Sequence, residues 1–515
     1  MHHAMMKRCA LLLLAIFGFT ALSLAQTVTG TVTDKKGEPL PGVTVTVKGT
    51  KNATSTNNAG VYTLNNVGAD AVLVFTGAGI SQQEIPVGGK ASVNANLEAS
   101  VSSLNEVVVV GYGSLKKKDL TGAVASVKSK DFNQGFVTSP DQLLQNKVAG
   151  LEITNNSGQP GVATTIKIRG NNSIRAVNNP LYVIDGVPLD GRTARPSVSL
   201  TGFGSTPESN PLLYINPNDI AQVDILKDAS SAAIYGARGA NGVIAITTKK
   251  GSSSGTKLEF GTSFSASAGF MKKYEILDAA QFRSALTKYQ QPATLDKGQN
   301  VDAMKEITQS TLSSDYSLAL SSGNENGKIR ASFLFSKARG FLKNSNLDKY
   351  LGSIGGQYKF LDKKLGLDFN VRVGSTKEEI VNVSNTAGST GNLISAALSW
   401  NPTESFTDPT TGYYINPGGG SGNPMALLKA YSDIARVNSV LADISASYKL
   451  LDNLEYKFLY AINSGVGDRN TNVDGWIEGY PGISGSGIGL KSYAKLASQT
   501  ITHTLNYNVK LSSQI

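Results

Sequence analysis

Short alternating runs of apolar and polar residues mark the first part of the chain. Between residues 27 and 98, valines alternate with threonines or other polar residues around Val28 to Val32 and Val43 to Val47. Turn sequences rich in Gly, Asn and Pro separate these runs. A period of two residues indicates strands with one buried face. We therefore predict a small β-sandwich over residues 26–98.

Longer alternating runs begin near residue 256 and continue to the end of the sequence. Each run has roughly ten residues, the length of a tilted strand that crosses an outer membrane, and about eight are present. In one run Leu365, Leu367 and Phe369 share a face opposite Gly366 and Asp368. Residues 251–515 are thus predicted to form antiparallel strands of a transmembrane β-barrel, with polar stretches 376–392 and 401–422 as loops. A large soluble β-sandwich or propeller is the alternative.

Residues 114–250, between these two parts, have mixed helix and strand signals. Ser139 precedes Pro140 and is followed by Gln142, which predicts a helix capped by Ser139 and ended by Gly150. Asp228 is expected to cap a second helix, from Ala229 to Tyr235. Short apolar runs separated by Asp-Gly and Asn-Gly pairs predict strands and tight turns. This part is expected to be a compact α+β domain, so the fold class is mainly β with one α+β domain.

The first 25 residues resemble a secretion signal. Lys7 and Arg8 precede an apolar stretch that is too short to cross a bilayer comfortably, and Ser23-Leu24-Ala25 offers the small residues that a signal peptidase reads. We predict that residues 1–25 are a signal peptide and that cleavage occurs before Gln26.

Few side chains in the remaining chain suit catalysis or metal binding. Cys9 is the only cysteine in the sequence and lies in the predicted signal, while His503 is the only histidine after it. A thiol nucleophile, a disulfide and a His-rich zinc site are therefore excluded from the mature chain. The net charge is +10, but the densest basic run is only residues 116–118, and no nucleic-acid motif accompanies it. We predict no enzymatic activity, no cofactor, no metal and no nucleic-acid partner.

Four consecutive valines lie in a short segment between the sandwich and the α+β domain. Valine favours extended backbone, and Val107 to Val110 could form either an ordinary buried strand or a strand offered to a partner's sheet edge. The position of this segment, directly before a glycine-rich domain, favours the partner interpretation.

The order of these parts resembles the SusC/RagA type of TonB-linked outer-membrane proteins. The resemblance rests on several motifs found together: residues 106–113, 116–123, 166–173, 180–188, 215–219, 226–229, 232–236 and 238–243. The sandwich itself resembles carboxypeptidase-regulatory-like modules, through residues 30–34 and 41–47.

The resemblance implies a role for each part. Residues 99–113 would be a linker with a TonB box, residues 114–250 a plug that fills the barrel, and Arg169 and Arg238 plug residues that contact the barrel wall. The implied TonB-box residues are Glu106, Val107, Val108, Val109, Val110, Gly111 and Tyr112.

The implied function is TonB-dependent import of a large nutrient, a glycan or an oligopeptide, across the outer membrane of a Gram-negative bacterium. The implied partners are the energy transducer TonB, a SusD-like surface lipoprotein and outer-membrane lipid. A barrel of eight strands encloses a lumen that side chains alone fill, so it could not hold a plug domain as well. We therefore expect the sequence to be a truncated, N-terminal portion of a larger barrel protein. The alternative is a β-rich surface or periplasmic receptor that binds ligands or signals without transport.

Overall fold

The computed structural model describes most of the chain after residue 25. The described residues are 26–34, 37–50, 52–77, 83–97, 107–110, 113–116, 124–172, 178–252, 255–267, 276–384, 391–415, 422–480 and 482–509. The predicted signal peptide lies outside them. The chain forms two compact units, the first ending at residue 107 and the second comprising most of the chain from residue 108. Each unit is described by itself.

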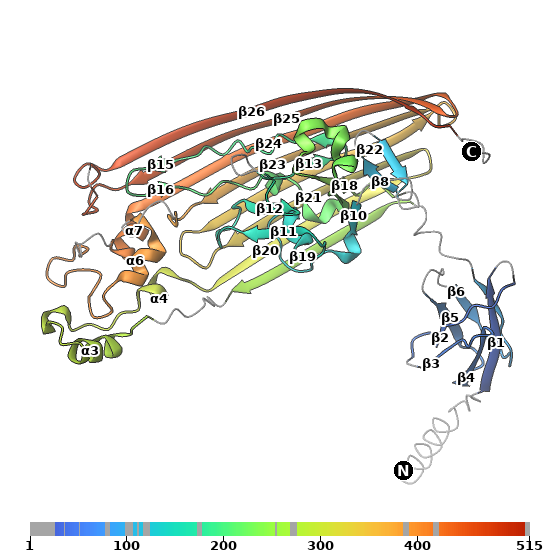
Figure 1. Cartoon of the computed structure of the whole chain (residues 1–515), viewed down its shortest axis with the longest axis horizontal. Helices are drawn as coiled ribbons and strands as arrows, with labels where there is room; N and C mark the ends of the chain where they lie inside the picture. The colour runs from blue at the N-terminus through green and yellow to red at the C-terminus, as the bar shows by residue number, and fades with distance from the viewer. Residues whose placement is uncertain are drawn as a thin grey trace, which may run out of the picture. The chain divides into compact units, whose positions relative to one another are not determined.

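The first unit is a small β-sandwich, as the alternation predicts (Figure 1). A three-stranded sheet has the order β4-β1-β7 and a four-stranded sheet has the order β3-β2-β5-β6. The strands are β1 (Gln26–Asp34), β2 (Thr44–Val47), β3 (Ala53–Ser55), β4 (Val61–Val67), β5 (Val72–Thr76), β6 (Gln83–Pro86) and β7 (Ala95–Leu97).

The alternating positions of β1 set the core of this sandwich. Val28 and Val32 are fully buried, while the threonines between them are exposed. Gly30 lies between the two valines on the buried face, and a Cβ atom at this position would lie 1.9 Å from the carbonyl oxygen of Val93. The hydroxyl of Tyr62 donates a hydrogen bond of 2.7 Å to the same oxygen. Gly30 therefore allows the chain at Val93 to pass close to β1.

The valine segment forms the extended backbone that its composition predicts. β8 (Val107–Val110) and β9 (Gly113–Lys116) make a two-stranded sheet. Glu106, Gly111 and Tyr112 lie outside the described residues.

Residues 124–252, here called the plug segment, are built around a mixed sheet in the second unit. Its five strands have the order β10-β17-β18-β13-β14, and two small hairpins, β11-β12 and β15-β16, accompany it. The strands are β10 (Val124–Lys128), β11 (Leu151–Asn155), β12 (Thr164–Ile168), β13 (Leu181–Ile184), β14 (Val187–Pro188), β15 (Ser199–Leu200), β16 (Gly204–Ser205), β17 (Ile220–Leu226) and β18 (Val243–Thr248).

One predicted helix of the plug segment, the one after Ser139, is shorter than the sequence predicts, whereas the predicted range Ala229–Tyr235 is covered by two consecutive helical segments. The helices of the plug segment are η2 (Ser129–Asp131), η3 (Pro140–Leu144), η4 (Pro211–Tyr214), η5 (Pro217–Asp219), α2 (Ala229–Ala232) and η6 (Ala233–Gly239). Ser139 does not cap η3 through its side chain, and Asp228 does not cap α2. Instead, Gln142 accepts a hydrogen bond of 2.8 Å from the amide of Thr138, and Asp228 pairs with Arg169. The prediction of a cap is therefore wrong at both positions, although the helical range predicted after Asp228 does form.

An antiparallel eight-stranded sheet forms the rest of the second unit. Each strand pairs with the next along the chain, from β19 to β26, which agrees with the number of long alternating runs (Figure 1). The strands are β19 (Lys257–Ser267), β20 (Thr311–Gly323), β21 (Gly327–Arg339), β22 (Asn346–Phe360), β23 (Leu365–Glu379), β24 (Tyr431–Leu451), β25 (Leu454–Val473) and β26 (Ile488–Tyr507).

The connections between these strands differ at the two ends of the sheet. At one end they are tight, at residues 324–326, 361–364 and 452–453. At the other end the connections at 268–310 and 380–430 are long and include helices; we call this the long-loop end.

The prediction that residues 376–392 form a loop is wrong for its first four positions, because β23 continues to Glu379. The helices are α3 (Ala279–Lys288), η7 (Ala293–Leu295), α4 (Ala303–Ile307), α6 (Leu393–Ser399) and α7 (Pro424–Ala430).

The two faces of the eight-stranded sheet differ in polarity. The inner face, which meets the plug segment, carries many polar side chains, including Asp315, Arg330, Arg372 and Asp443, all of them buried. The outer face exposes large apolar side chains along every strand. They include Leu258, Phe260, Phe264, Leu312, Tyr316, Leu318, Leu320, Phe333, Tyr350, Ile354, Val373, Ile444, Tyr448, Tyr456, Ile501, Leu505 and Tyr507.

No helix in the described part of the chain is long and apolar enough to cross a membrane.

We predict that Gly30→Ala destabilises the sandwich by about 1–3 kcal/mol, because the new methyl group overpacks the contact with Val93. Urea unfolding of a fragment spanning residues 26–97 measures this change. Thr29→Ala, at an exposed position on the same strand, is the control and is expected to change stability by less than about 0.5 kcal/mol. Equal stability of Gly30→Ala and wild type would contradict the predicted packing.

Candidate functional site: the interface between plug segment and sheet

Buried ion pairs join the plug segment to the inner face of the eight-stranded sheet. In one of them the plug supplies the arginine, Arg195, and in others it supplies the carboxylate, Asp185 or Asp219. Each partner on the sheet occupies an inward position of a strand. The two parts therefore meet through complementary charges removed from water.

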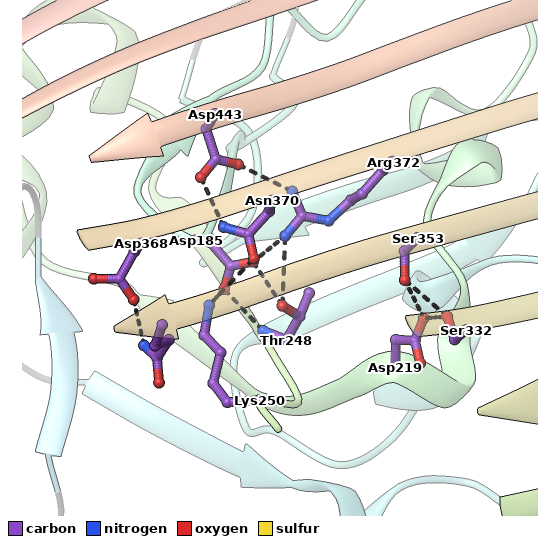
Figure 2. A network of polar contacts seen from close by, with 11 residues as sticks. Asp185, Asp219, Thr248, Lys250, Ser332, Ser353, Asp368, Asn370, Arg372 and Asp443 are labelled. Atoms are coloured by element: carbon purple, nitrogen blue, oxygen red, sulfur yellow. Dashed lines mark hydrogen bonds and ion pairs between the residues drawn. The ribbon is translucent and has the colours of Figure 1, made fainter. Parts of the chain in front are cut away.

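Asp185 occupies a tight turn between β13 and β14, where its backbone is in the left-handed region with φ of 48° and Gly186 follows with φ of 90°. The turn aims the carboxylate at β23, where Arg372 donates a hydrogen bond to it (Figure 2). Thr248 at the end of β18 donates two more, from its amide at 2.9 Å and its hydroxyl at 2.7 Å. Lys250 lies 3.8 Å away. Asp185 is thus held by both plug and sheet.

The same arginine reaches a second carboxylate on the neighbouring strand. Nη1 of Arg372 lies 3.2 Å from Oδ1 of Asp443 on β24, and Asn370 donates a hydrogen bond of 2.7 Å to the other oxygen of Asp443 (Figure 2). All three charged side chains of this group, Arg372, Asp185 and Asp443, are at most 7% exposed. Arg372 therefore links a plug turn to two adjacent strands.

The surroundings of Asp185 also set its proton affinity. Burial alone would raise the pKa of this carboxyl, but Arg372, Lys250 and the two bonds from Thr248 together hold the pKa below its ordinary value. Asp185 therefore remains charged, as the pairing requires.

Asp219, at the end of η5, makes a second contact with the sheet. It accepts hydrogen bonds from Ser332 on β21 and from Ser353 on β22, the latter at 3.0 Å (Figure 2). Arg330 on β21 donates to it at 3.1 Å and also contacts Glu259 on β19 at 3.2 Å. One plug carboxylate thus binds side chains from adjacent strands.

A third contact involves the loop between β14 and β15. Arg195 donates a hydrogen bond of 2.8 Å to Glu378 on β23, and both side chains are almost completely buried, at 3% and 1% exposure. Arg469 on β25 binds Asp433 on β24 and donates a bond of 2.9 Å to the carbonyl oxygen of Pro196. The loop is therefore held through both a side chain and its backbone.

Two glycines on β25 allow this loop to lie directly on the strand. A Cβ atom at Gly467 would lie 2.2 Å from the carbonyl oxygen of Ala194, and one at Gly465 would lie 2.9 Å from the Cβ atom of Ala194. A side chain at Gly467 would force the loop away from the strand, because its Cβ atom would meet backbone, whereas a Cβ atom at Gly465 would require only a small shift of Ala194.

Apolar contacts surround these polar ones. The main hydrophobic core of the plug segment includes Leu441 on β24 together with Leu459 and Ala461 on β25. Leu213 of the plug packs with Ala338 and Leu347 of the sheet. The interface therefore combines specific charge pairing with continuous apolar packing.

Arg169 and Arg238, which we predicted to contact the barrel wall, lie elsewhere in the plug segment. Arg169 forms an ion pair with Asp228 of the plug segment, and half of its side chain is exposed. Arg238 is exposed on η6. Their contact with a barrel wall stays a prediction, as does the role of residues 106–112 as a TonB box.

The residues that join plug and sheet in the structure, Asp185, Arg195 and Asp219, were not identified as site residues from the sequence. A signal was available on the sheet side, because Arg372 and Asp443 are charged residues on the inward, polar side of alternating runs and are nevertheless buried. Buried charges require partners, so each inward charge predicts an opposite charge on whatever fills the lumen.

Within the described residues, no group of three or more His, Cys, Asp or Glu side chains is placed to hold a metal ion.

Comparison with known families supports this division of the chain into plug segment and sandwich. Residues 116–243 match the model of the TonB-dependent receptor plug domain. Residues 28–109 match the model of the CarboxypepD_reg-like domain. The class of protein that these matches define is the TonB-dependent receptor with an N-terminal regulatory-like module.

Similar proteins specify the type. TonB-dependent receptor SusC of Bacteroides thetaiotaomicron is 32% identical over 86% of this chain and 45% of its own length. TonB-dependent receptor P3 of Formosa agariphila is 32% identical over 98% of this chain and 48% of its own. The chain thus spans about half the length of the curated relatives it matches. The resemblance to SusC/RagA-type TonB-dependent receptors is confirmed, and these relatives are receptors rather than enzymes.

Solved structures share the fold. The RagAB peptide importer in its open-open state aligns with a TM-score of 0.65 and 20% identity, over 79% of this chain and 47% of that one. The structure of the RagAB peptide transporter aligns with a TM-score of 0.62 and 19% identity. The mainly β fold, with an α+β plug beside an antiparallel sheet, is confirmed.

We predict that Asp185→Asn weakens docking of the plug segment by about 3 kcal/mol, because it leaves the Arg372 charge buried with one carboxylate fewer. Protease accessibility of the plug segment along a urea series measures the change. Asp190→Asn is the matched control: Asp190 pairs with the largely exposed Arg192 nearby in the chain, and its loss is expected to have little effect. Equal effects of the two substitutions would contradict a dominant role for the buried pair.

Docking should also weaken in acid. Because the pKa of Asp185 is lower in the folded protein, its contribution is present above the ordinary carboxyl pKa of about 3.9 and is lost as the pH falls through the lowered value. The same protease assay between pH 6 and pH 3 should show a loss of docking below about pH 4. The loss should be smaller in Asp185→Asn, and an identical pH profile for both proteins would contradict this assignment.

Proposed function

We propose that this chain is part of a TonB-dependent importer that carries a large nutrient, a glycan or an oligopeptide, across the bacterial outer membrane. In this proposal residues 251–515 contribute strands to the barrel, residues 114–250 form the plug that gates it, and residues 99–113 contain the TonB box. Residues 1–25 act as a signal peptide that directs export of the chain across the inner membrane and is then removed. The observation that carries the proposal is a folded plug segment docked by buried charges on the polar face of a sheet whose other face is apolar.

The outer face of the sheet supports placement in a membrane. Large apolar and aromatic side chains are exposed along successive strands, whereas soluble proteins rarely expose apolar patches beyond a few hundred Å². Tyr448 and Tyr456 lie near the tight-turn end of β24 and β25, where aromatic residues of barrels meet the membrane interface. Lipid is therefore the proposed neighbour of this face.

The docked plug supports a need for an external source of energy. Separating plug from sheet would break the ion pairs of Arg372 and Arg195, which costs several kcal/mol for each charge that stays buried without its partner. A mechanical pull on a segment connected to the plug can supply this energy. β8 precedes the plug segment in the chain and is extended, so its backbone suits pairing with a strand of TonB.

The partners and substrate are inferred from the relatives. SusC and the RagAB structures support a surface lipoprotein of the SusD type as partner, and RagAB is a peptide importer.

The proposed TonB contact is tested by Val108→Pro. Proline removes a backbone amide from β8 and cannot complete a strand ladder, so we expect at least a tenfold loss of co-purification with the periplasmic domain of TonB from detergent-solubilised receptor.

Val108→Thr is the matched control, because threonine keeps both the amide and the preference for extended backbone. It should bind TonB as wild type does. TonB binding that survives Val108→Pro would remove the proposed role of β8, and a receptor found only in the soluble fraction would favour a ligand-binding protein without transport.

A further inference from the structure

A row of charged side chains crosses the outer face of the eight-stranded sheet near its long-loop end. Each member lies directly opposite the next on the neighbouring strand, from β21 to β25. The residues before and after each member on its own strand are buried on the inner face, so the members themselves point outward. We call this set the outer charged row: Lys337, Asp348, Lys377, Arg436 and Asp468.

The outer charged row marks one boundary of the apolar band. The next row toward the tight turns carries the stacked rings of Tyr316, Phe335 and Tyr350, with centroids 6.2 and 4.8 Å apart. From there to the tight turns, every outward position of β21 to β25 is uncharged.

The height of this uncharged band matches a membrane. On β23 the band runs ten residues, from Ser375 to Leu365. For a strand tilted by about 40°, this corresponds to roughly 25 Å along the membrane normal, which is the height of the apolar band of outer-membrane barrels. The outer charged row therefore lies at the level of the lipid head groups.

Two neighbouring members of the row have the same charge. Lys377 on β23 and Arg436 on β24 are directly opposite each other, and like charges in this arrangement destabilise a sheet. Glu379 lies 2.9 Å from Lys377 and Asp468 lies 3.8 Å from Arg436, but all four side chains are at least 35% exposed. Because exposed ion pairs contribute little, an anion between the two cations would reduce their repulsion.

Lys337 adds a third cation to the row. Its Nζ lies 5.3 Å from the centroid of the Phe335 ring, and the acid opposite it, Asp348, pairs with Arg339 at 2.7 Å. The outward positions of the row and of the rows on either side of it hold six cations and three acids, a net charge of +3. The cations are Lys337, Arg339, Lys377, Arg436, Lys491 and Lys495, and the acids are Asp348, Glu379 and Asp468.

The position of the row identifies an anion that fits it. Long loops lie on the extracellular side of outer-membrane barrels, and the outer leaflet there is made of glycolipid whose sugar headgroup carries phosphates. Neighbouring strands are about 4.8 Å apart, so Lys337 lies roughly 10 Å from Lys377 across the sheet. The three cations are therefore spaced to contact two phosphates of one headgroup.

We propose that Lys337, Lys377 and Arg436 bind the phosphates of a glycolipid in the outer leaflet, whose acyl chains lie on Phe335 and Tyr350. This inference rests on the proposed placement of the chain in the outer membrane. It goes beyond import, because it assigns the receptor a lipid ligand on its outer face.

The test titrates the full-length receptor in detergent with diphosphorylated lipid A and with the same lipid after removal of its phosphates. We expect the diphosphorylated lipid to bind and the double variant Lys377→Gln with Arg436→Gln to weaken this binding about tenfold or more, because each cation near a head group attracts its negative charge. Added salt should weaken binding by wild type more steeply than binding by the variant.

The matched control removes two cations at the opposite end of the same strands. Lys363→Gln with Lys364→Gln changes the exposed tight turn between β22 and β23 and should bind the lipid as wild type does. Lys377→Arg keeps the charge and should also bind. Protease resistance of the plug segment in urea should be unchanged in both double variants, because the replaced side chains are exposed, so this readout separates a lost lipid contact from misfolding.

Four results would each overturn the proposal. They are no binding of the diphosphorylated lipid, equal binding of the lipid without phosphates, equal affinities of the two double variants, and displacement of the lipid by an equal concentration of inorganic phosphate, which would indicate a site for the free ion.

The titration requires neither TonB nor a transported substrate. A failure of the import function alone, such as TonB binding unaffected by Val108→Pro, would therefore leave the lipid-binding result intact and distinguishable.

Discussion

A charge that is removed from water must find an opposite charge within reach, and this requirement organises the interface between plug segment and sheet. Arg372 is buried on β23 and meets Asp185 of the plug and Asp443 of β24. Arg195 and Glu378 satisfy the same requirement with the roles of plug and sheet reversed. An isolated buried charge destabilises a protein far more than a paired one does. The plug segment therefore has one strongly preferred position on the sheet.

Several local features exist to bring these charges together. The left-handed turn at Asp185 aims its carboxylate at β23, and the glycines at 465 and 467 allow the loop carrying Arg195 to lie on β25. The alternation of the strands then separates the inner, polar face from the outer, apolar one. The same strands thus provide both an inner face that binds the plug segment and an outer face suited to lipid.

Much of this architecture could be predicted from alternation alone. The valines of β1 and the apolar positions of β23 point to the faces that the sequence pattern assigns, because a strand has a period of two residues. The long strand runs, the sandwich and the extended valine segment follow from the same rule. Alternation does not identify residues 114–250 as a plug, and this assignment came from the family motifs.

The contacts of the plug could not be predicted in this way. Asp185 pairs with a residue 187 positions away, and such pairing depends on how two separately folded parts meet. Arg169 likewise pairs with Asp228, 59 positions away in the plug segment, and its contact with a barrel wall stays a prediction. Helix caps at Ser139 and Asp228 failed for a related reason: contacts with residues distant in sequence, Asn210 and Arg169, take up the two side chains.

The central claim is that the plug segment sits on the inner face of the sheet, with the loop at Ala194 lying on β25. A disulfide between Ala194→Cys and Gly465→Cys in the full-length receptor, assayed in isolated outer membranes under air oxidation, tests it most directly, because the two Cβ positions are in contact and a shift of about 1 Å brings them to the separation of a disulfide. We expect air oxidation to cross-link this pair. We expect no cross-link for Ala194→Cys with Val466→Cys, whose side chain points to the outer face. If the pair with Gly465→Cys failed to cross-link, or if the pair with Val466→Cys cross-linked equally, this position of the plug segment on the sheet would be contradicted.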